Sequence, residues 1–197
     1  MTIRPAVPAD RPAIERICLL TAAAGGDATG EHSDQTMLSD VYATPYLDGP
    51  GGFALVWDEG EGPLGYILGT SDTVAFQEWF TGVWWPSVTA SHSESNDADR
   101  KLLASATNPV RMLTSVLANY PAHLHVDLLP EAQGRGAGRA LIEAACELLA
   151  ERGVSGVHLE VDPANVRALA FYPRVGFDLE ADQQGNPVFC RRLAVAE

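Results

Sequence analysis

The sequence predicts an α/β (α+β) fold, in which a mixed and mostly antiparallel sheet carries helices on both faces. Residues 123–129 alternate in polarity as a strand does, and a glycine-rich turn leads from them into an amphipathic helix over 139–152. Earlier in the chain, residues 53–57 and 64–69 flank a turn of Asp, Glu, Gly and Pro, which is typical of a β-hairpin. A second pair of strands closes the chain.

The N-terminal third is expected to begin with a strand over residues 2–7. Asp10 is a good N-cap and Pro12 is tolerated in a first helical turn, so a helix should follow. A second short helix is expected over 35–42, before the hairpin.

Residues 71–120 predict an insertion of helix and loop within a single domain that spans 1–197. An aromatic-rich helix is expected after Asp72 and should end at Pro86. The polar, Ser-rich stretch 87–99 is typical of a surface loop, with His92 solvated. Residues 100–120 are expected to be partly helical, with a break at Asn108-Pro109.

The helix over 139–152 has an apolar stripe at helical spacing, and Gly153 suits its C-terminus. Residues 156–161 then alternate as a strand, and a short helix is expected over 166–172. The last two strands are predicted over 178–181 and 188–193.

Composition limits the classes of function. The net charge of −13 argues against a nucleic-acid partner. The sequence contains no run of about 18 apolar residues, so no membrane span is expected. The N-terminus lacks the apolar region of a signal peptide. The three cysteines are far apart in sequence and are expected to be buried thiols. A cytoplasmic protein with no membrane partner is expected.

The charge is unevenly distributed. Residues 17–99 contain 13 Asp and Glu but no Lys or Arg. This stretch either provides solubility through net charge or attracts a cationic substrate. The sequence leaves both interpretations open.

The glycine-rich turn, Gln133-Gly134-Arg135-Gly136-Ala137-Gly138, joins a strand to a helix N-terminus. Free amides and the helix dipole favour an anion there, and Arg135 and Arg139 add charge. The dinucleotide-binding fingerprint needs a glycine at its sixth position, where this turn has Arg139. The Gly-Lys-Ser/Thr triplet that ends a P-loop does not occur here either. A bound phosphate or pyrophosphate is therefore predicted, in the pattern Gln/Arg-x-x-Gly-x-Gly/Ala.

That pattern resembles the acyl-coenzyme A pyrophosphate loop of the GNAT acetyltransferase superfamily. The order of elements and the segment Asn165-x-x-Ala168-x-x-Phe171-Tyr172 resemble this superfamily too, well over 122–193 and loosely over 1–70. A narrower resemblance is to the acetyltransferase-like domain associated with O-GlcNAc hydrolases and its stand-alone bacterial relatives. The segments that carry it include 65–70, 84–86, 123–130 and 158–161.

The resemblance implies acetyl-CoA as co-substrate, bound between splayed parallel strands. Leu128 and Leu129 would pair with the pantetheine amides, and the Leu128 amide would stabilise the oxyanion. Tyr172 would be the acid for the leaving thiolate, although Pro173 departs from the superfamily pattern. The coenzyme-binding residues implied are Leu128, Leu129, Gln133, Gly134, Arg135, Gly136, Ala137, Gly138, Arg139, Asn165, Ala168 and Phe171.

Two neighbouring strands carry polar residues on one side. His123, His125 and Asp127 alternate on the first, and His158 and Glu160 on the second. Because parallel strands are usually apolar on both faces, this pattern is unusual. Asp127 is the first candidate for a general base and Glu160 the second; a self-satisfied carboxylate–imidazole pair is the structural alternative.

The sequence thus predicts an N-acetyltransferase that moves an acetyl group from acetyl-CoA to a primary amine by direct attack. The acceptor expected is a cationic amine, such as a lysine side chain, a polyamine or an amino sugar, and the protein a monomer or homodimer. A non-catalytic acetyl-CoA-binding sensor or interaction domain is the alternative. No metal is expected, although His123, His125, Asp127 and His158 could form a divalent metal site.

Overall fold

The computed structural model describes residues 2–183 and 185–194. Met1, Gln184 and residues 195–197, which the predicted domain includes, lie outside the described residues. The strands are β1 (Thr2–Pro5), β2 (Gly52–Asp58), β3 (Pro63–Thr70), β4 (Ala122–Leu128), β5 (Gly156–Glu160), β6 (Asp178–Gln183) and β7 (Asn186–Arg192).

These strands form one seven-stranded sheet in the order β1-β2-β3-β4-β5-β7-β6. Only β4 and β5 run parallel to each other; every other neighbouring pair among the described strands is antiparallel. The predicted mixed, mostly antiparallel sheet is therefore confirmed, and both predicted hairpins are present.

The helices expected over 35–42, 139–152 and 166–172 are present to within a few residues, but 45–48 and parts of 87–99, the predicted loop, are helical as well. The helices and helical turns are η1 (Pro8–Asp10), α1 (Arg11–Thr21), α2 (Thr36–Tyr42), α3 (Pro45–Asp48), α4 (Thr73–Trp79), the π-helical turn η2 (Phe80–Trp84), α5 (Trp85–Val88), η3 (Thr89–Ser91), α6 (Asp97–Thr107), η4 (Pro130–Ala132), α7 (Ala137–Glu151), α8 (Val166–Phe171) and η5 (Tyr172–Val175).

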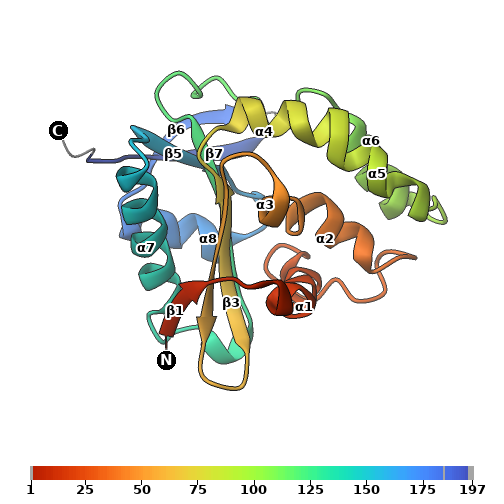
Figure 1. Ribbon diagram of the computed structural model, residues 1–197, viewed down its shortest axis with the longest axis horizontal. Helices are drawn as coiled ribbons and strands as arrows, with labels where there is room; N and C mark the ends of the chain where they lie inside the picture. The colour runs from red at the N-terminus through yellow and green to blue at the C-terminus, as the bar shows by residue number, and fades with distance from the viewer. Residues whose placement is uncertain (1, 184, 195–197) are drawn as a thin grey trace.

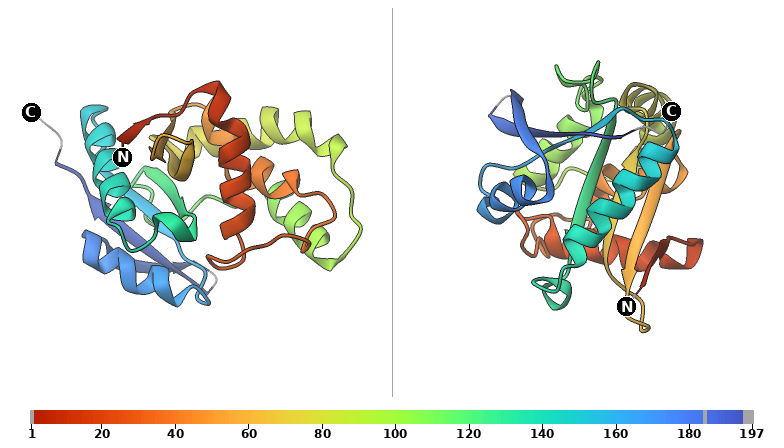
Figure 2. Two further views of the ribbon diagram at one scale, coloured as in Figure 1. Left: turned by 90° about the horizontal axis from the view of Figure 1, so that it is seen from below. Right: turned by 90° about the vertical axis from the view of Figure 1, so that its left-hand side faces the viewer.

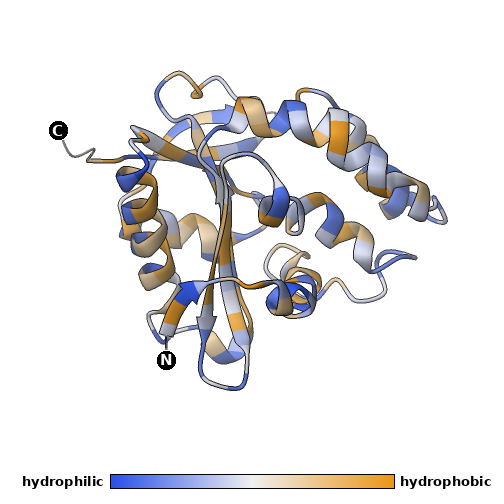
Figure 3. Ribbon diagram, viewed as in Figure 1, coloured by the Kyte–Doolittle hydropathy of each residue, from blue (hydrophilic) through white to orange (hydrophobic). Residues whose placement is uncertain are grey.

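Helices cover both faces of the sheet, as predicted (Figure 1). The apolar stripe of α7 and residues of α8 pack in one core cluster, while α1, α2 and α4 pack in a second cluster on the other face. Figure 2 shows α4 to α6 projecting on the side away from α7. Strands and helix α7 carry many of the hydrophobic residues (Figure 3). The three cysteines are free and buried, as expected.

Two features of the insertion differ from the prediction. Pro86 does not end the aromatic helix: α4, η2 and α5 follow one another without a gap, and Pro86 lies in α5. The π-helical turn η2 breaks the α-helical pattern before it. The helical residues 97–107 then end before Asn108-Pro109, where the break was predicted.

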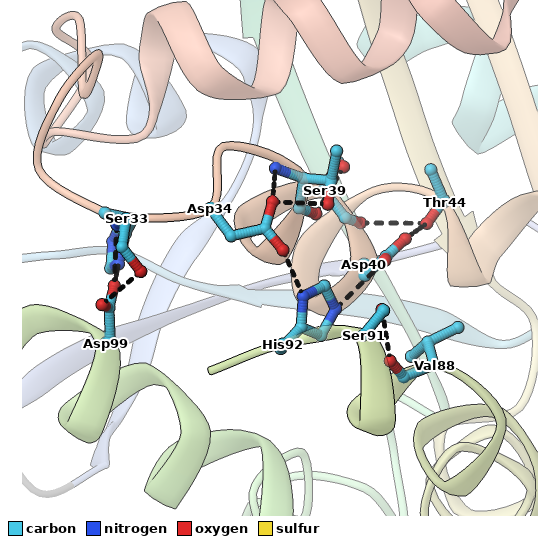
Figure 4. Close-up of polar contacts among 11 residues, drawn as sticks. Ser33, Asp34, Ser39, Asp40, Thr44, Val88, Ser91, His92 and Asp99 are labelled. Atoms are coloured by element: carbon cyan, nitrogen blue, oxygen red, sulfur yellow. Dashed lines mark hydrogen bonds and ion pairs between the residues drawn. The ribbon is translucent and has the colours of Figure 1, made fainter. Parts of the chain in front are cut away.

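His92 is the second difference, because its side chain is fully buried rather than solvated. Its Nδ1 lies 2.7 Å from an Asp34 oxygen and its Nε2 lies 3.2 Å from an Asp40 oxygen. Nearby, buried Asp99 accepts hydrogen bonds from the backbone and hydroxyl of Ser33. Figure 4 shows these contacts, which fasten the insertion to the segment around α2.

Candidate active site

The candidate active site lies where β4 and β5 separate. The two strands pair only at Ala122–Val157 and His123–His158, while β5 stays paired with β7 along its length. The opening contains a cavity of about 580 Å³. Residues of α1, α2, β4, β5 and the insertion line it. The parallel pair is therefore splayed, as the resemblance implied.

The backbone at the end of β4 has one open edge. The Leu129 N–H donates to the Leu64 carbonyl at 2.9 Å. Since alternate residues of an antiparallel strand point to opposite neighbours, the Leu128 N–H points away from β3, toward the side that β5 has left. Leu129 differs from the expectation: its N–H is used, and its carbonyl accepts from the Ala132 N–H. Of Leu128 and Leu129, Leu128 is therefore the residue whose N–H is directed into the opening.

The glycine-rich turn has the conformation that an anion site needs. Gly134 and Gly136 have φ of +71° and +84°, and a Cβ at either position would meet nothing within 4 Å. Gly136 is the N-cap of α7 and no side chain caps the helix. The first amides of α7, from Ala137 on, therefore lack a capping partner. Gln133 holds the turn by donating to the Leu128 carbonyl at 3.0 Å.

The two arginines of this turn are engaged by the protein, which the sequence did not indicate. An Arg135 nitrogen lies 2.8 Å from a carboxylate oxygen of Glu59, in the β2–β3 turn. Arg139 donates to the Arg174 carbonyl at 2.6 Å. Because the Arg135–Glu59 pair is exposed, it is weak and exchangeable. The backbone amides are the part of this site that is free of other partners.

Of Asn165, Ala168 and Phe171, only Asn165 lines the cavity, while the other two pack against the α7-side core. The Asn165 side chain accepts from the Ala168 N–H at 3.0 Å, which caps α8, and it lines the cavity. The Phe171 ring lies over the start of α7, because a Cβ at Gly138 would be 3.2 Å from its Cζ atom. Gly138 therefore permits a close approach between α7 and α8.

The predicted polar face of β4 is confirmed. Leu124 and Val126 belong to the α7 side, and Asp127 lies on the opposite side with the histidines. The Tyr66 hydroxyl donates to Asp127 Oδ2 at 2.7 Å. Burial raises the pKa of Asp127 to about 6, although the hydrogen bond from Tyr66 opposes the shift. A carboxylate with such a pKa can exchange protons near neutrality.

The second strand brings Glu160 to the same cavity, at the end of β5. Partial burial raises the pKa of Glu160, while a hydrogen bond from Asn186 and the charge of Arg111 lower it. His158, in contrast, is buried and its Nδ1 donates to the Tyr120 carbonyl at 2.8 Å. Both carboxylates predicted as bases therefore face one cavity.

The other two histidines belong to a chain of hydrogen bonds whose direction is determined. Thr73 donates to the Pro121 carbonyl at 2.6 Å, so its hydroxyl oxygen must accept from His123 Nδ1. Burial lowers the pKa of His123 and of His125, so both are neutral. His123 Nε2 then accepts from Tyr46 at 2.7 Å, and the Tyr46 oxygen accepts from His125 Nε2 at 2.9 Å. The unprotonated Nδ1 of His125 is left for the cavity.

We expect Tyr46→Phe to lower the free energy of unfolding by roughly 2–4 kcal/mol, because it leaves two buried imidazole nitrogens without a partner. Tyr172→Phe is the matched control, since it removes a hydroxyl from a buried tyrosine that has no hydrogen-bond partner among the described residues. Urea unfolding of both variants measures the difference. Equal losses in the two variants would contradict the hydrogen-bond chain.

Tyr172 lies on the α7 side of the sheet rather than in the cavity lining. Its ring packs against Phe171, Phe177 and Phe189. Burial and the charge of Asp127 raise its pKa. Pro173 has the predicted effect, because α8 ends at Phe171 and the chain continues as the 3-10 helix η5. None of the described residues makes a hydrogen bond with the Tyr172 hydroxyl.

Sequence reasoning missed several residues of this site. Tyr46 and Tyr66 were not singled out, and Tyr66 meets Asp127 only through the register of β3 and β4. Arg111 from the insertion also lines the cavity. Conversely, none of the 13 acidic residues of 17–99 is among the residues that line it. Several of them bind partners within the protein instead, such as Asp34 with His92 and Asp58 with Arg4.

Within residues 2–183 and 185–194, no group of three or more His, Cys, Asp or Glu side chains is arranged to hold a metal ion. The hydrogen bonds of His123 and His158 explain this at the cavity, because they occupy nitrogens that a metal would need. Among the same residues, no helix is long and apolar enough to cross a membrane.

Comparisons with known proteins agree with this geometry. The model of the acetyltransferase (GNAT) family matches residues 25–177. Protein O-GlcNAcase of Rattus norvegicus is 23% identical over 192 residues, which is 94% of this chain and 21% of that protein. The chain thus spans about a fifth of the length of this relative. [Ribosomal protein bS18]-alanine N-acetyltransferase of Escherichia coli (strain K12) is 33% identical over 88 residues, 43% of this chain and 60% of that protein.

Solved structures extend the likeness to the whole chain. The crystal structure of SsHAT has a TM-score of 0.87 and 40% identity, and the match covers 100% of this chain and 98% of that one. A phosphinothricin acetyltransferase from Sinorhizobium meliloti, solved in complex with AcCoA, has a TM-score of 0.54 and 19% identity over 98% of this chain and 88% of that one. The second likeness concerns the fold alone.

Proposed function

We propose, on the premise that this chain belongs to the GNAT family of acetyltransferases, that it transfers an acetyl group from acetyl-CoA to a primary amine by direct attack. The observation that carries the proposal is the placement of Asp127. Its carboxylate, with a pKa raised to about 6, lines the cavity at the point where β4 and β5 separate. The open Leu128 amide lies on the neighbouring residue.

The opening and the glycine-rich turn have the chemistry that acetyl-CoA needs. The uncapped amides of α7 would take the pyrophosphate, and Gly134 and Gly136, where a Cβ would meet nothing within 4 Å, leave space around the turn. The free edge of β4 would pair with pantetheine. Besides Leu128, the residues proposed to bind the coenzyme are Gln133, Gly134, Arg135, Gly136, Ala137, Gly138, Arg139, Asn165, Ala168 and Phe171. Leu129 is omitted because both its backbone groups are used.

The reaction first needs a neutral amine. A lysine-like amine has a pKa of about 10.4, so neutrality at pH 7 costs roughly 4.6 kcal/mol. Asp127, directly or through water, would take the proton, and Glu160 at the same cavity is the second candidate. The amine then attacks the thioester carbonyl, whose developing oxyanion would be stabilised by the Leu128 N–H.

The leaving thiolate needs a proton, and Tyr172 is proposed to supply it. Its raised pKa keeps the hydroxyl protonated, and its hydroxyl is not engaged by any residue that the structure describes. It lies on the α7 side, next to Phe171, and not among the cavity carboxylates. The acid and the base would thus act from opposite sides of the thioester.

We expect kcat/KM to fall as the pH drops through about 6, because a base must be deprotonated to act and Asp127 has a pKa of about 6. Tyr66→Phe removes a donor that favours the ionised carboxylate, so the acid limb of the profile should move to higher pH. The pH dependence of kcat/KM in both proteins measures this. An acid limb at the same pH in Tyr66→Phe would argue against Asp127 as the base.

Calorimetric titration with acetyl-CoA tests the proposed function, with desulfo-coenzyme A and ATP as controls. Tight binding of acetyl-CoA together with amine-dependent release of the CoA thiol is the expected result. Binding without release, across lysine peptides, polyamines, amino sugars and amino acids, would favour the non-catalytic sensor. Absence of binding would overturn the assignment of the coenzyme site.

A further inference from the structure

Arg111 lines the cavity from the segment that follows α6. Its guanidinium lies 5.4 Å from the centre of the Tyr42 ring and 4.8 Å from that of the buried Phe80 ring. Two aromatic contacts fix the plane of the group, so that its edges are presented in a constant direction.

Within the described part of the chain no carboxylate forms an ion pair with this guanidinium, although its charge acts on the Glu160 carboxyl of the same cavity. The recorded ion pairs involve other arginines and histidines, and Arg111 makes one long hydrogen bond, 3.5 Å from Nη2 to the Val41 carbonyl. Its Nε is buried without any acceptor. Because a partly buried cation without a counter-ion costs free energy, such a group is expected where a ligand brings the anion.

The lining of the cavity carries charged groups of both signs. Arg111 is the one Lys or Arg among its lining residues, and the three lining histidines are kept neutral by burial. Asp127, Glu160 and Asp162 contribute the negative charge from β4 and from the end of β5. The lining thus offers carboxylates to an ammonium group and a guanidinium to an anion.

We infer that the acceptor is a zwitterion, an amine that also carries a carboxylate, and that Arg111 binds this carboxylate while the amine faces Asp127. The inference rests on the proposed function and narrows its acceptor class. A single carboxylate matches a single guanidinium, whereas a doubly charged phosphate would meet the nearby acidic groups. Polyamines and simple amino sugars leave Arg111 without a partner.

The test compares free amino acids with their C-terminal amides, which differ only in the carboxylate. Spermidine, glucosamine and phosphoethanolamine complete the panel, and CoA thiol release is the readout. We expect the acids to be preferred. Arg111→Gln should lower kcat/KM for the acids by about 10- to 100-fold and leave the amides unchanged, because a charge-assisted contact is lost.

Two variants separate recognition from folding. Arg111→Lys keeps the charge and should retain part of the preference for acids. Arg100→Gln is the matched control, an arginine of the same insertion whose pairs with Glu94 and Asp97 lie at the surface. It should leave the preference intact.

Equal rates for acids and amides, faster turnover of spermidine or phosphoethanolamine, or no turnover of any carboxylate-bearing amine overturns the inference. Acetyl-CoA titration of the same preparations separates this failure from that of the proposed function. If wild-type protein binds acetyl-CoA but fails these comparisons, the coenzyme assignment stands and the acceptor class is wrong. If it binds none, both are wrong.

Discussion

Asp127→Asn is expected to lower kcat by about 10²- to 10⁴-fold while the affinity for acetyl-CoA stays unchanged. Asparagine has nearly the same shape and can still accept from Tyr66, but it cannot take a proton. Single-turnover kinetics with a working acceptor, together with calorimetric titration of acetyl-CoA, measures both quantities.

The same variant separates a catalytic role from a structural one. Burial raises the pKa of Asp127, so its ionised form at neutral pH is less favourable in the folded protein than in the unfolded chain. A neutral side chain removes this cost. Asp127→Asn should therefore be at least as stable as the wild type at pH 7, and a loss of activity cannot then be attributed to unfolding.

Glu160 and Asp162 provide matched comparisons, because both also line the cavity. If Asp127 is the base, Glu160→Gln and Asp162→Asn should have much smaller effects on kcat. A large effect of Glu160→Gln with little effect of Asp127→Asn would transfer the role to Glu160. Unchanged kcat in all three variants would leave the reaction without a base among the cavity carboxylates.

The residues of this site that sequence reasoning found are those that local pattern determines. Alternation along 123–129 places His123, His125 and Asp127 on one face whatever the strand's neighbours are, and the structure confirms that face. The conformation of the glycine turn also follows locally, since Gly136 adopts a positive φ before a helix. These features need no knowledge of the rest of the chain.

The features that sequence reasoning missed depend on distant partners. His92 lies in a Ser-rich stretch that is typical of a solvated loop, yet Asp34 and Asp40, more than 50 residues earlier, bury it. Arg135 was expected to add charge to an anion site, and the β2–β3 turn brings Glu59 against it. Neither contact has a local signal, because each joins segments that only the tertiary fold brings together.

The acidic stretch of 17–99 shows why composition alone cannot assign a substrate. Its excess of negative charge suggested attraction of a cationic acceptor, but the cavity carboxylates come from β4 and from the end of β5. Asp34, Asp58 and Asp99 of the stretch are used in contacts that hold the fold. A residue's charge indicates a ligand only after its internal partners are known.

Gly136→Glu is expected to weaken acetyl-CoA binding by about 100-fold or more, because it places a carboxylate at the uncapped N-terminus of α7, where the pyrophosphate would lie. Gly153→Glu is a closely matched control. Gly153 has φ of +76°, close to the +84° of Gly136, and a Cβ at either position would meet nothing within 4 Å. The two variants therefore share the backbone strain, but Gly153 follows the opposite end of α7.

Gly136→Ala completes the comparison, since it adds the strain without the charge and should bind acetyl-CoA nearly as the wild type does. The helix dipole makes the contrast sharper. A carboxylate at the N-terminus of α7 is favourable for folding and one beyond its C-terminus is not, so Gly136→Glu should be the more stable of the two Glu variants. If Gly136→Glu is more stable than Gly153→Glu and still fails to bind acetyl-CoA, unfolding does not explain the loss, and the anion site does. Equal affinities in the two Glu variants would instead show that the pyrophosphate binds away from this turn.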